Sequence, residues 1–122
     1  MDDRDAIVSA VNDYWEGWFA GDAGRMRRAL HPALTKVGIR VDASGQPNTV
    51  SMTAPDMIGW TDAGDGVAER PADMAFDVAI DDVYQEIATV TVRSAIYREY
   101  LHLVRTLHGW KILSALYMRV RE

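Results

Sequence analysis

Asp22 and His31 are the two side chains of this sequence that could work together as a proton-transferring pair. A carboxylate held beside an imidazole can act as a general base, and a neutral imidazole can take up or release a proton near pH 7. Each residue also has a purely structural explanation. Asp22 follows Gly21 and can accept hydrogen bonds at the start of a helix, whereas His31 can contact the last carbonyl groups of that helix.

Tyr14 and Trp18 lie one helical turn apart and could form the floor of an apolar pocket. In such a pocket the Tyr14 hydroxyl could donate to a carbonyl or hydroxyl group of a bound molecule. Large aromatic side chains at this spacing also pack as an ordinary core ridge against a sheet. Met57 and Trp60, on a later helical segment, could either line the same pocket or simply fill it.

Glu99 and His102 complete the candidate ligand-binding residues. Glu99 could reach the rim of a pocket from the start of a strand, and His102 could point either into the pocket or toward a dimer partner. The three histidines lack the i, i+4 spacing of a helical zinc motif, and the sequence contains no cysteine. Because glycine-rich phosphate-binding motifs are also missing from the sequence, we expect neither a metal nor a cofactor.

The overall composition is that of a small globular protein. A chain of 122 residues with 48% hydrophobic residues suits one domain, residues 1–122, with a single core. The formal net charge of -5 argues against nucleic acid as a partner, because phosphate backbones attract basic surfaces. No apolar run approaches the length of a membrane span, and the acidic start is not a secretory signal, so we expect a cytoplasmic protein.

The first half of the chain alternates between helical and extended patterns. Apolar residues at three- and four-residue spacing predict an amphipathic helix over 3–20, and a second helix is expected over about 23–31, before Pro32. The period then changes to two, which predicts a strand over 34–41, followed by a turn and a short strand near 49–52. Thr53 and Pro55 suit the start of a helix over about 54–61, and residues 61–72 are predicted to be a loop.

From Met74 onward the pattern is that of strands. The stretch from Glu86 to Leu107 contains neither Gly nor Pro, and as one strand it would extend roughly 70 Å, far beyond the usual length. We therefore expect a turn inside it, at Arg98-Glu99, and a last turn at His108-Gly109 before the final strand. Helices followed by long antiparallel strands indicate an α+β fold with helices on one face of a bent sheet.

Two groups of residues resemble those of a known family. The opening residues Asp13-Tyr14-Trp15-Glu16-Gly17-Trp18, Gly21-Asp22 and Leu30-His31-Pro32 resemble NTF2-like proteins of the group described as "putative lumazine-binding", near the SnoaL-like cyclases. Near the end, Tyr100-Leu101-His102-Leu103 and Gly109-Trp110-Lys111-Ile112 are similar to that group's closing hairpin. The resemblance implies an NTF2-like (cystatin-like) cone, in which a curved antiparallel sheet wraps around N-terminal helices and leaves a pocket at its open end.

One position departs from the family pattern. The group commonly has an aspartate just before the Tyr-Leu of the penultimate strand, where this chain has Glu99. Asp22 lies where some dehydratase-like relatives hold a catalytic aspartate, so the resemblance adds to the case for Asp22 with His31.

Relatives with this fold include isomerases, dehydratases, polyketide cyclases and plain binding subunits, so the fold alone selects no reaction. We expect a protein that binds a small apolar or aromatic molecule through pocket residues drawn from Tyr14, Trp18, His31, Met57, Trp60, Glu99 and His102. The alternative is a cofactor-independent isomerase, dehydratase or cyclase that uses the Asp22–His31 pair. Both hypotheses include a homodimer, because the last strands are apolar on both faces and one face needs cover.

Overall fold

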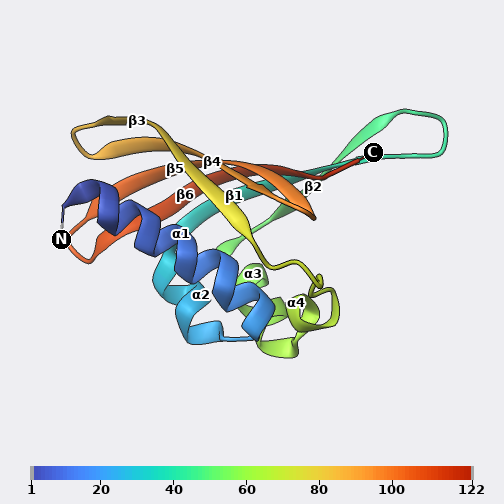
Figure 1. The fold of residues 1–122 in the computed structure, drawn as a ribbon, viewed down its shortest axis with the longest axis horizontal. Helices are drawn as coiled ribbons and strands as arrows, with labels where there is room; N and C mark the ends of the chain where they lie inside the picture. Colours follow the sequence, from blue (N-terminus) through green and yellow to red (C-terminus); the bar gives the residue numbers. More distant parts are fainter. Residues whose placement is uncertain (1, 122) are drawn as a thin grey trace.

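Four helices lie on one side of a six-stranded sheet in the computed structural model, which describes residues 2–121 (Figure 1). The helices are α1 (Asp3–Ala20), α2 (Ala23–Ala29), α3 (Ala54–Ala63) and α4 (Asp65–Ala68). The strands are β1 (Leu30–Val41), β2 (Pro47–Met52), β3 (Phe76–Tyr84), β4 (Ile87–Ser94), β5 (Tyr97–Thr106) and β6 (Gly109–Arg119). No helix among the described residues is long and apolar enough to cross a membrane.

The sheet has the strand order β2-β1-β6-β5-β4-β3. Every neighbouring pair is antiparallel except β1 and β6, which run parallel, so the predicted antiparallel sheet is correct for all pairs but one. The parallel pair arises because β1 and β6 are far apart in the chain and no hairpin joins them. Its register is irregular between Leu30 and Thr35, around Pro32, which has no N–H group to give to a neighbouring strand.

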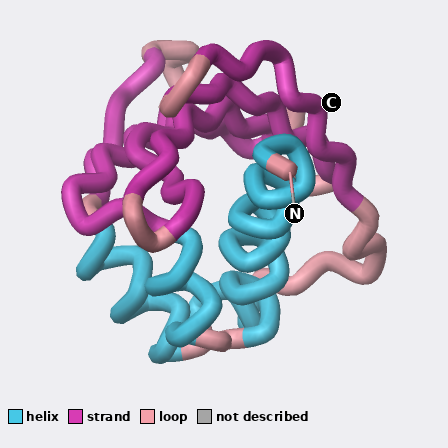
Figure 2. The backbone as a smooth tube through the Cα atoms, turned by 90° about the vertical axis from the view of Figure 1, so that its left-hand side faces the viewer, coloured by secondary structure: helices cyan, strands magenta, loops and turns pink. Residues whose placement is uncertain are grey.

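Helix α1 spans the predicted residues and its ends have clear local causes. The Asp2 carboxylate accepts from the Asp5 N–H at 2.8 Å, and Gly21 ends the helix in the left-handed conformation with φ 69°. The buried side of the helix includes Ile7, Val11 and Phe19, which belong to the main core. Figure 2, which looks along the molecule, shows the strands arching over the helices. The sheet therefore closes over the first helix, as predicted.

The predicted turn at Arg98-Glu99 is wrong, because the chain turns earlier, between Ser94 and Tyr97. The Ser94 hydroxyl oxygen accepts from the backbone N–H groups of Ile96 at 3.3 Å and Tyr97 at 3.0 Å. The serine hydroxyl thus stabilises this turn, which lacks the Gly or Asn that usually marks a turn in a sequence. Glu99 consequently lies inside β5 rather than at the start of a strand.

Other boundaries also differ from the predicted ones, and two of these differences bear on the site. The second helix ends at Ala29, so His31 is part of β1 and not of the helix exit. The segment predicted as a loop over 61–72 contains the short helix α4, which begins directly after Gly64 ends α3 with φ 87°. Gly66 lets α4 lie against α1, since a Cβ there would be 2.1 Å from the Trp18 carbonyl oxygen. Close backbone packing, rather than a sequence pattern, holds this helix in place.

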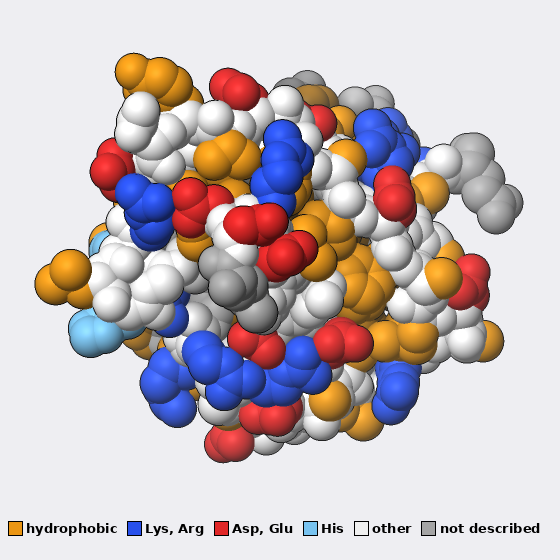
Figure 3. All heavy atoms as spheres, turned by 60° about the vertical axis from the view of Figure 1, so that its left-hand side comes forward, with side chains coloured by type: hydrophobic (Ala, Val, Ile, Leu, Met, Phe, Trp, Pro, Cys, Tyr) orange, Lys and Arg blue, Asp and Glu red, His pale blue; other side chains and the backbone are white. Residues whose placement is uncertain are grey.

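Ion pairs between α1 and α2 fix the two helices to each other. Arg25 contacts Asp13 at 3.0 Å and Glu16 at 2.7 Å, and Arg28 contacts the same Asp13 at 3.1 Å. Figure 3 shows Lys/Arg and Asp/Glu side chains next to one another over the face that it presents. Partly exposed ion pairs of this kind contribute little stability individually.

Candidate functional site

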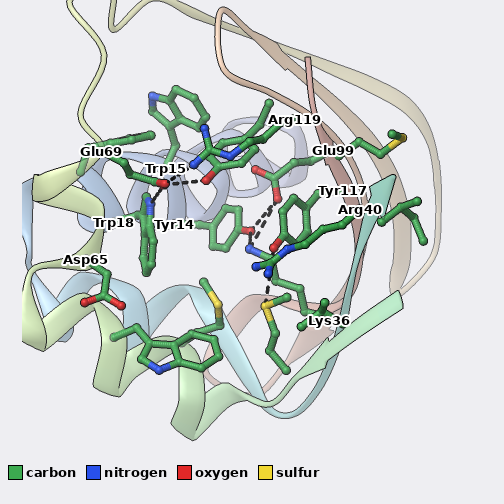
Figure 4. Close-up of a pocket in the computed structure, with 18 of the residues that line it drawn as sticks. Tyr14, Trp15, Trp18, Lys36, Arg40, Asp65, Glu69, Glu99, Tyr117 and Arg119 are labelled. Carbon is green, nitrogen blue, oxygen red and sulfur yellow. Dashed lines mark hydrogen bonds and ion pairs between the residues drawn. The ribbon is translucent and has the colours of Figure 1, made fainter. Parts of the chain in front are cut away.

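A cavity of about 700 Å³ lies between the helices and the concave face of the sheet. Its walls come from α1, α3, the α4 segment and strands β1, β2, β5 and β6 (Figure 4). Aromatic rings form much of the lining: Tyr14, Trp15, Trp18, Trp60, Tyr97 and Tyr117. Charged side chains also reach it, among them Lys36, Arg40, Asp65, Glu69, Glu99 and Arg119. The cavity is thus apolar in its walls and charged at defined points.

Three of these side chains form a buried cluster, which we call the Lys36 triad (Figure 4). The Tyr14 hydroxyl donates to Glu99 Oε1 at 2.6 Å, and Lys36 Nζ donates to the Tyr14 oxygen. Lys36 Nζ lies 3.7 Å from the same Glu99 oxygen, so lysine and glutamate also form an ion pair. The three residues are only 7%, 4% and 3% exposed for Lys36, Tyr14 and Glu99. They come from β1, α1 and β5, so only the folded chain brings them together.

The surroundings of the triad decide its protonation. Burial lowers the pKa of Lys36, and the negative charge of Glu99 works in the opposite direction. Burial raises the pKa of Tyr14 well above its ordinary value, and the neighbouring Glu99 raises it further. Tyr14 therefore remains a protonated hydrogen-bond donor. The Lys36 amine also lies over the rings of Tyr14 and Tyr117, at 4.8 Å and 4.6 Å from the ring centroids, where π faces favour a cation.

A second set of contacts, the Glu69 cluster, is centred on the glutamate that follows α4. Glu69 Oε1 accepts from the Trp18 indole N–H at 2.7 Å and from the Tyr97 hydroxyl at 2.6 Å. Its other oxygen accepts from Arg119 at 2.6 Å. Burial, and then hydrogen bonding to Glu69, raises the pKa of Tyr97, which therefore stays protonated. The cluster holds the Trp18 ring in one orientation on the cavity wall.

Gly38 on β1 gives the cavity part of its shape. A Cβ at this position would lie 2.6 Å from the ring of Tyr117 on the neighbouring β6. Because glycine has no side chain, the Tyr117 ring can lie across β1 and beneath Lys36. Any larger residue would push that ring away. Gly38 thus serves close packing rather than an unusual backbone angle.

Five of the sequence-predicted ligand-binding residues line the cavity: Tyr14, Trp18, Met57, Trp60 and Glu99. Trp60 is 39% exposed, whereas Met57 is buried deeper in the wall. The fold therefore brings together aromatic, thioether and carboxylate groups from α1, α3 and β5 at one cavity.

His31 and His102 are outside the cavity lining among residues 2–121. His31 accepts from the Ala33 N–H at 3.0 Å through Nδ1, a contact within its own strand. His102 is exposed on the other face of the sheet, since it alternates with the buried Leu101 and Leu103. Of the two orientations considered for His102, the structure shows the one that faces away from the pocket.

Asp22 is the N-cap of α2 and accepts from the Arg25 N–H at 3.1 Å. Like His31, it is not part of the lining formed by the described residues. The structure thus does not bring the predicted carboxylate–histidine pair to the cavity: each partner bonds to its own local backbone, and neither is among the residues that line it. Nor do residues 2–121 contain three His, Asp or Glu side chains grouped as a metal site would require.

Sequence reasoning missed Lys36, Glu69 and Arg119. Lys36 shares one face of β1 with Leu34 and Gly38, and that face looks more polar in the sequence than the face of Val37 and its neighbours. In an amphipathic strand the more polar face is expected to meet solvent, so Lys36 would be predicted to be exposed. Glu69 lies in a segment predicted to be a loop, where nothing signals a buried acceptor. The pairing of distant strands reveals Lys36, and the packing of α4 on α1 reveals Glu69.

Comparison with solved structures shows the same fold in bacterial proteins. An NTF2-like protein of unknown function from Methylobacillus flagellatus KT aligns with a TM-score of 0.70 at 18% identity, covering 99% of this chain and 94% of that one. Another from Shewanella baltica OS155 gives 0.68 at 19% identity, with 98% and 94% covered. An NTF2-like protein from Cytophaga hutchinsonii ATCC 33406 gives 0.69 at 16% identity, with 98% and 100% covered. Identities this low show the fold and nothing about the ligand.

No curated protein matches the sequence. The sequence profile of the family described as "Putative lumazine-binding" matches residues 2–118, nearly the whole chain. This match assigns the protein: it belongs to the "Putative lumazine-binding" family, and its cone of sheet and helices is the fold of the NTF2-like proteins named above.

Proposed function

We propose that this protein binds a small, mostly apolar or aromatic molecule in the cavity, with a polar end of that molecule at the Lys36 triad. The observation that carries the proposal is a buried lysine–glutamate pair with a tyrosine between them, facing an aromatic cavity of about 700 Å³. This volume falls within the range of about 300–1,000 Å³ that is typical of small-molecule pockets. Such pockets combine apolar walls with a few convergent polar groups, which is the arrangement found here.

Stability alone does not account for the triad. Replacing a buried ion pair by apolar residues of similar size is often neutral or stabilising, because removing two charges from water costs so much. The Lys36–Glu99 pair therefore adds little to the free energy of unfolding beyond what packed apolar side chains would give. Their position on a cavity wall favours a part in recognition, with Lys36 as the donor and Glu99 as an acceptor, while the Tyr14 hydroxyl, which donates to Glu99 and accepts from Lys36, holds the two in place.

The family description suggests a first ligand to test. Lumazine is a flat heteroaromatic compound that carries carbonyl groups and N–H groups. Its ring would pack against Trp18 and Trp60, and its carbonyl oxygens would accept hydrogen bonds from the Lys36 triad. We use it as a probe of this class of molecule, together with a panel of other planar heteroaromatic compounds.

We expect lumazine or a member of that panel to bind with one molecule per cavity, measured by calorimetry and by quenching of tryptophan fluorescence. Trp60→Ala should weaken binding about tenfold, because one aromatic contact in a pocket contributes ~1–2 kcal/mol. Tyr84→Ala removes an aromatic ring that is 67% exposed and outside the cavity lining, and should leave the affinity unchanged. Equal losses in both variants, or no binding across the panel, would contradict the proposal.

The enzymatic alternative has less support. A cofactor-independent isomerase, dehydratase or cyclase needs an acid–base group at the cavity, and the Asp22–His31 pair expected for it bonds to local backbone instead. Catalysis in this cavity would have to use titratable groups that line it, such as those of the Lys36 triad or the Glu69 cluster.

We further propose that the protein forms a homodimer through the convex face of the sheet. Val37, Leu116 and Tyr100 lie side by side there on β1, β6 and β5, in register with one another. Tyr100 and Leu116 are 48% and 44% exposed, a large apolar area for the centre of a sheet. A twofold axis would place this row against its own copy.

Light scattering at micromolar concentration should then give twice the mass of 13.6 kDa. Leu116→Arg should yield the monomer, because it puts two like charges into the contact. Leu107→Arg, at a fully exposed turn position, should leave the dimer intact. A monomeric wild type would end the proposal.

A further inference from the structure

The amine of Lys36 is a buried nucleophile on the wall of a ligand-sized cavity, and the binding function proposed above makes no use of that reactivity. We propose that Lys36 forms a Schiff base with the carbonyl group of an aldehyde or ketone bound in the cavity. This inference rests on the proposed binding function. It narrows the ligand class to small molecules that carry an aldehyde or ketone group.

The geometry around Lys36 supplies what amine capture requires. Its Nζ bonds to the Tyr14 hydroxyl, which in turn donates to Glu99 at 2.6 Å. The amine thus has both a hydroxyl and a carboxylate beside it. The distance from Lys36 Nζ to Glu99 Oε1 is 3.7 Å. A proton can pass between amine, hydroxyl and carboxylate without help from bulk water. This is the arrangement of nucleophile and adjacent acid–base group that activates side chains for covalent chemistry.

The electrostatic surroundings of the amine are set by four titratable groups. Tyr14 approaches it from α1, Glu99 from β5 and Tyr117 from β6, while the charge of Glu69 acts from farther away. Burial lowers the pKa of Lys36, and the two carboxylates oppose that shift. A lysine with a lowered pKa has a larger fraction of free amine near neutral pH, by about tenfold for each pKa unit.

The reaction balances with the groups present. Lys36 ammonium first passes one proton to the Glu99 carboxylate, directly or through the Tyr14 hydroxyl. The free amine then attacks the carbonyl carbon, and the proton that leaves nitrogen moves to the carbonyl oxygen, which gives a carbinolamine. Glu99 returns its proton to the hydroxyl group, which departs as water and leaves a protonated imine. The positive charge of the imine remains beside the restored carboxylate, as the ammonium was before.

The sequence offers an unusually clean test, because Lys36 and Lys111 are its only lysines. Lys111 lies on β6 outside the cavity lining, and its Nζ donates to the Arg28 carbonyl oxygen at 2.6 Å. The two lysines therefore differ in position and environment within one chain, and the second serves as an internal reference for the first.

We would incubate the full chain with benzaldehyde and sodium cyanoborohydride, which reduces the imine to a stable secondary amine, and locate the adduct by mass spectrometry of peptides. At pH 7 we expect Lys36 to be modified several times faster than Lys111, because its amine loses its proton more easily and lies on the wall of the cavity that holds the aldehyde. Labelling of Lys36 should also persist to lower pH, because its amine loses its proton more easily. Lys111→Arg should keep the fast adduct and Lys36→Arg should lose it, with folding checked by circular dichroism.

Modification confined to Lys111 or the α-amino group would overturn the inference, as would labelling of Lys36 that appears only after unfolding. Benzyl alcohol separates this failure from failure of the binding function, since it has the same ring but no carbonyl group. If benzyl alcohol binds in the cavity while benzaldehyde gives no adduct at Lys36, the Schiff base is excluded and binding stands. If no adduct forms and neither benzyl alcohol nor any member of the heteroaromatic panel binds, both proposals fail.

Discussion

Glu99→Gln should lower the free energy of unfolding by about 3 kcal/mol, the cost of leaving a buried charge without its partner. In the wild type, Glu99 balances the ammonium of Lys36 and accepts from the Tyr14 hydroxyl. The amide of glutamine can still accept from Tyr14, but it carries no charge to offset Lys36. Urea denaturation followed by tryptophan fluorescence would measure the loss.

A double variant tests whether the lost charge is the cause. Adding Lys36→Met to Glu99→Gln removes the unpaired ammonium and should recover most of the stability, because both charges are then gone. The matched control is Glu86→Gln, which breaks the exposed pair with Arg105 at 3.3 Å and should cost less than about 1 kcal/mol. If Glu99→Gln costs no more than Glu86→Gln, the buried pair does not have the energetic role assigned to it.

The same variant has a pH signature with a definite sign. Burial lowers the pKa of Lys36 in the folded chain, so between that value and its ordinary 10.5 the unfolded chain binds more protons. Stability from this group therefore rises with pH across that window and is lower below it. Without Glu99 to oppose the shift, the window widens. The deficit of Glu99→Gln relative to wild type should accordingly shrink as the pH is raised toward 10.5.

Gly66→Ala is expected to lower the free energy of unfolding by about 2–3 kcal/mol through overpacking. The new Cβ would lie 2.1 Å from the Trp18 carbonyl oxygen and 2.8 Å from its ring atom Cδ2. Because the first of these atoms is backbone, neither helix can relieve the clash by a simple rotamer change. Helix α4 must move away from α1, and Glu69, which follows α4, moves with it. The contacts from Glu69 to Trp18 and Tyr97 should weaken, with a red-shifted tryptophan fluorescence as the second readout.

Gly59→Ala provides the opposite expectation with the same chemical change. Gly59 lies in α3, where an added Cβ meets no atom within 4 Å. Alanine favours the helix over glycine by about 0.5–1 kcal/mol, so this variant should be slightly more stable than wild type. Equal shifts in the two variants would show that close packing of α4 on α1 is not what makes Gly66 necessary.

Local patterns were sufficient for the elements whose causes lie within a few residues. The helix over 3–20 was predicted to its ends, because its apolar stripe, the Asp2 cap and Gly21 are all readable in sequence. The helix that begins at Ala54 was predicted for the same kind of reason: Thr53 and Asp56 form a reciprocal cap with Pro in the first turn. The aromatic side of the cavity followed from these helices, since Tyr14, Trp18 and Trp60 project from them.

The chemistry of the cavity depends instead on strand register, which no local pattern specifies. Tyr14 and Glu99 are 85 positions apart in the chain, and they meet only because β5 pairs with β6 at the register observed. A shift of one residue would turn Glu99 to the convex face. Lys36 likewise faces inward because β1 joins β6 in parallel, with Gly38 making room for Tyr117. The sequence by itself determined helices α1 and α3 and the family resemblance. The tertiary structure decided which charges are buried, because burial is settled by contacts between segments that are remote from each other.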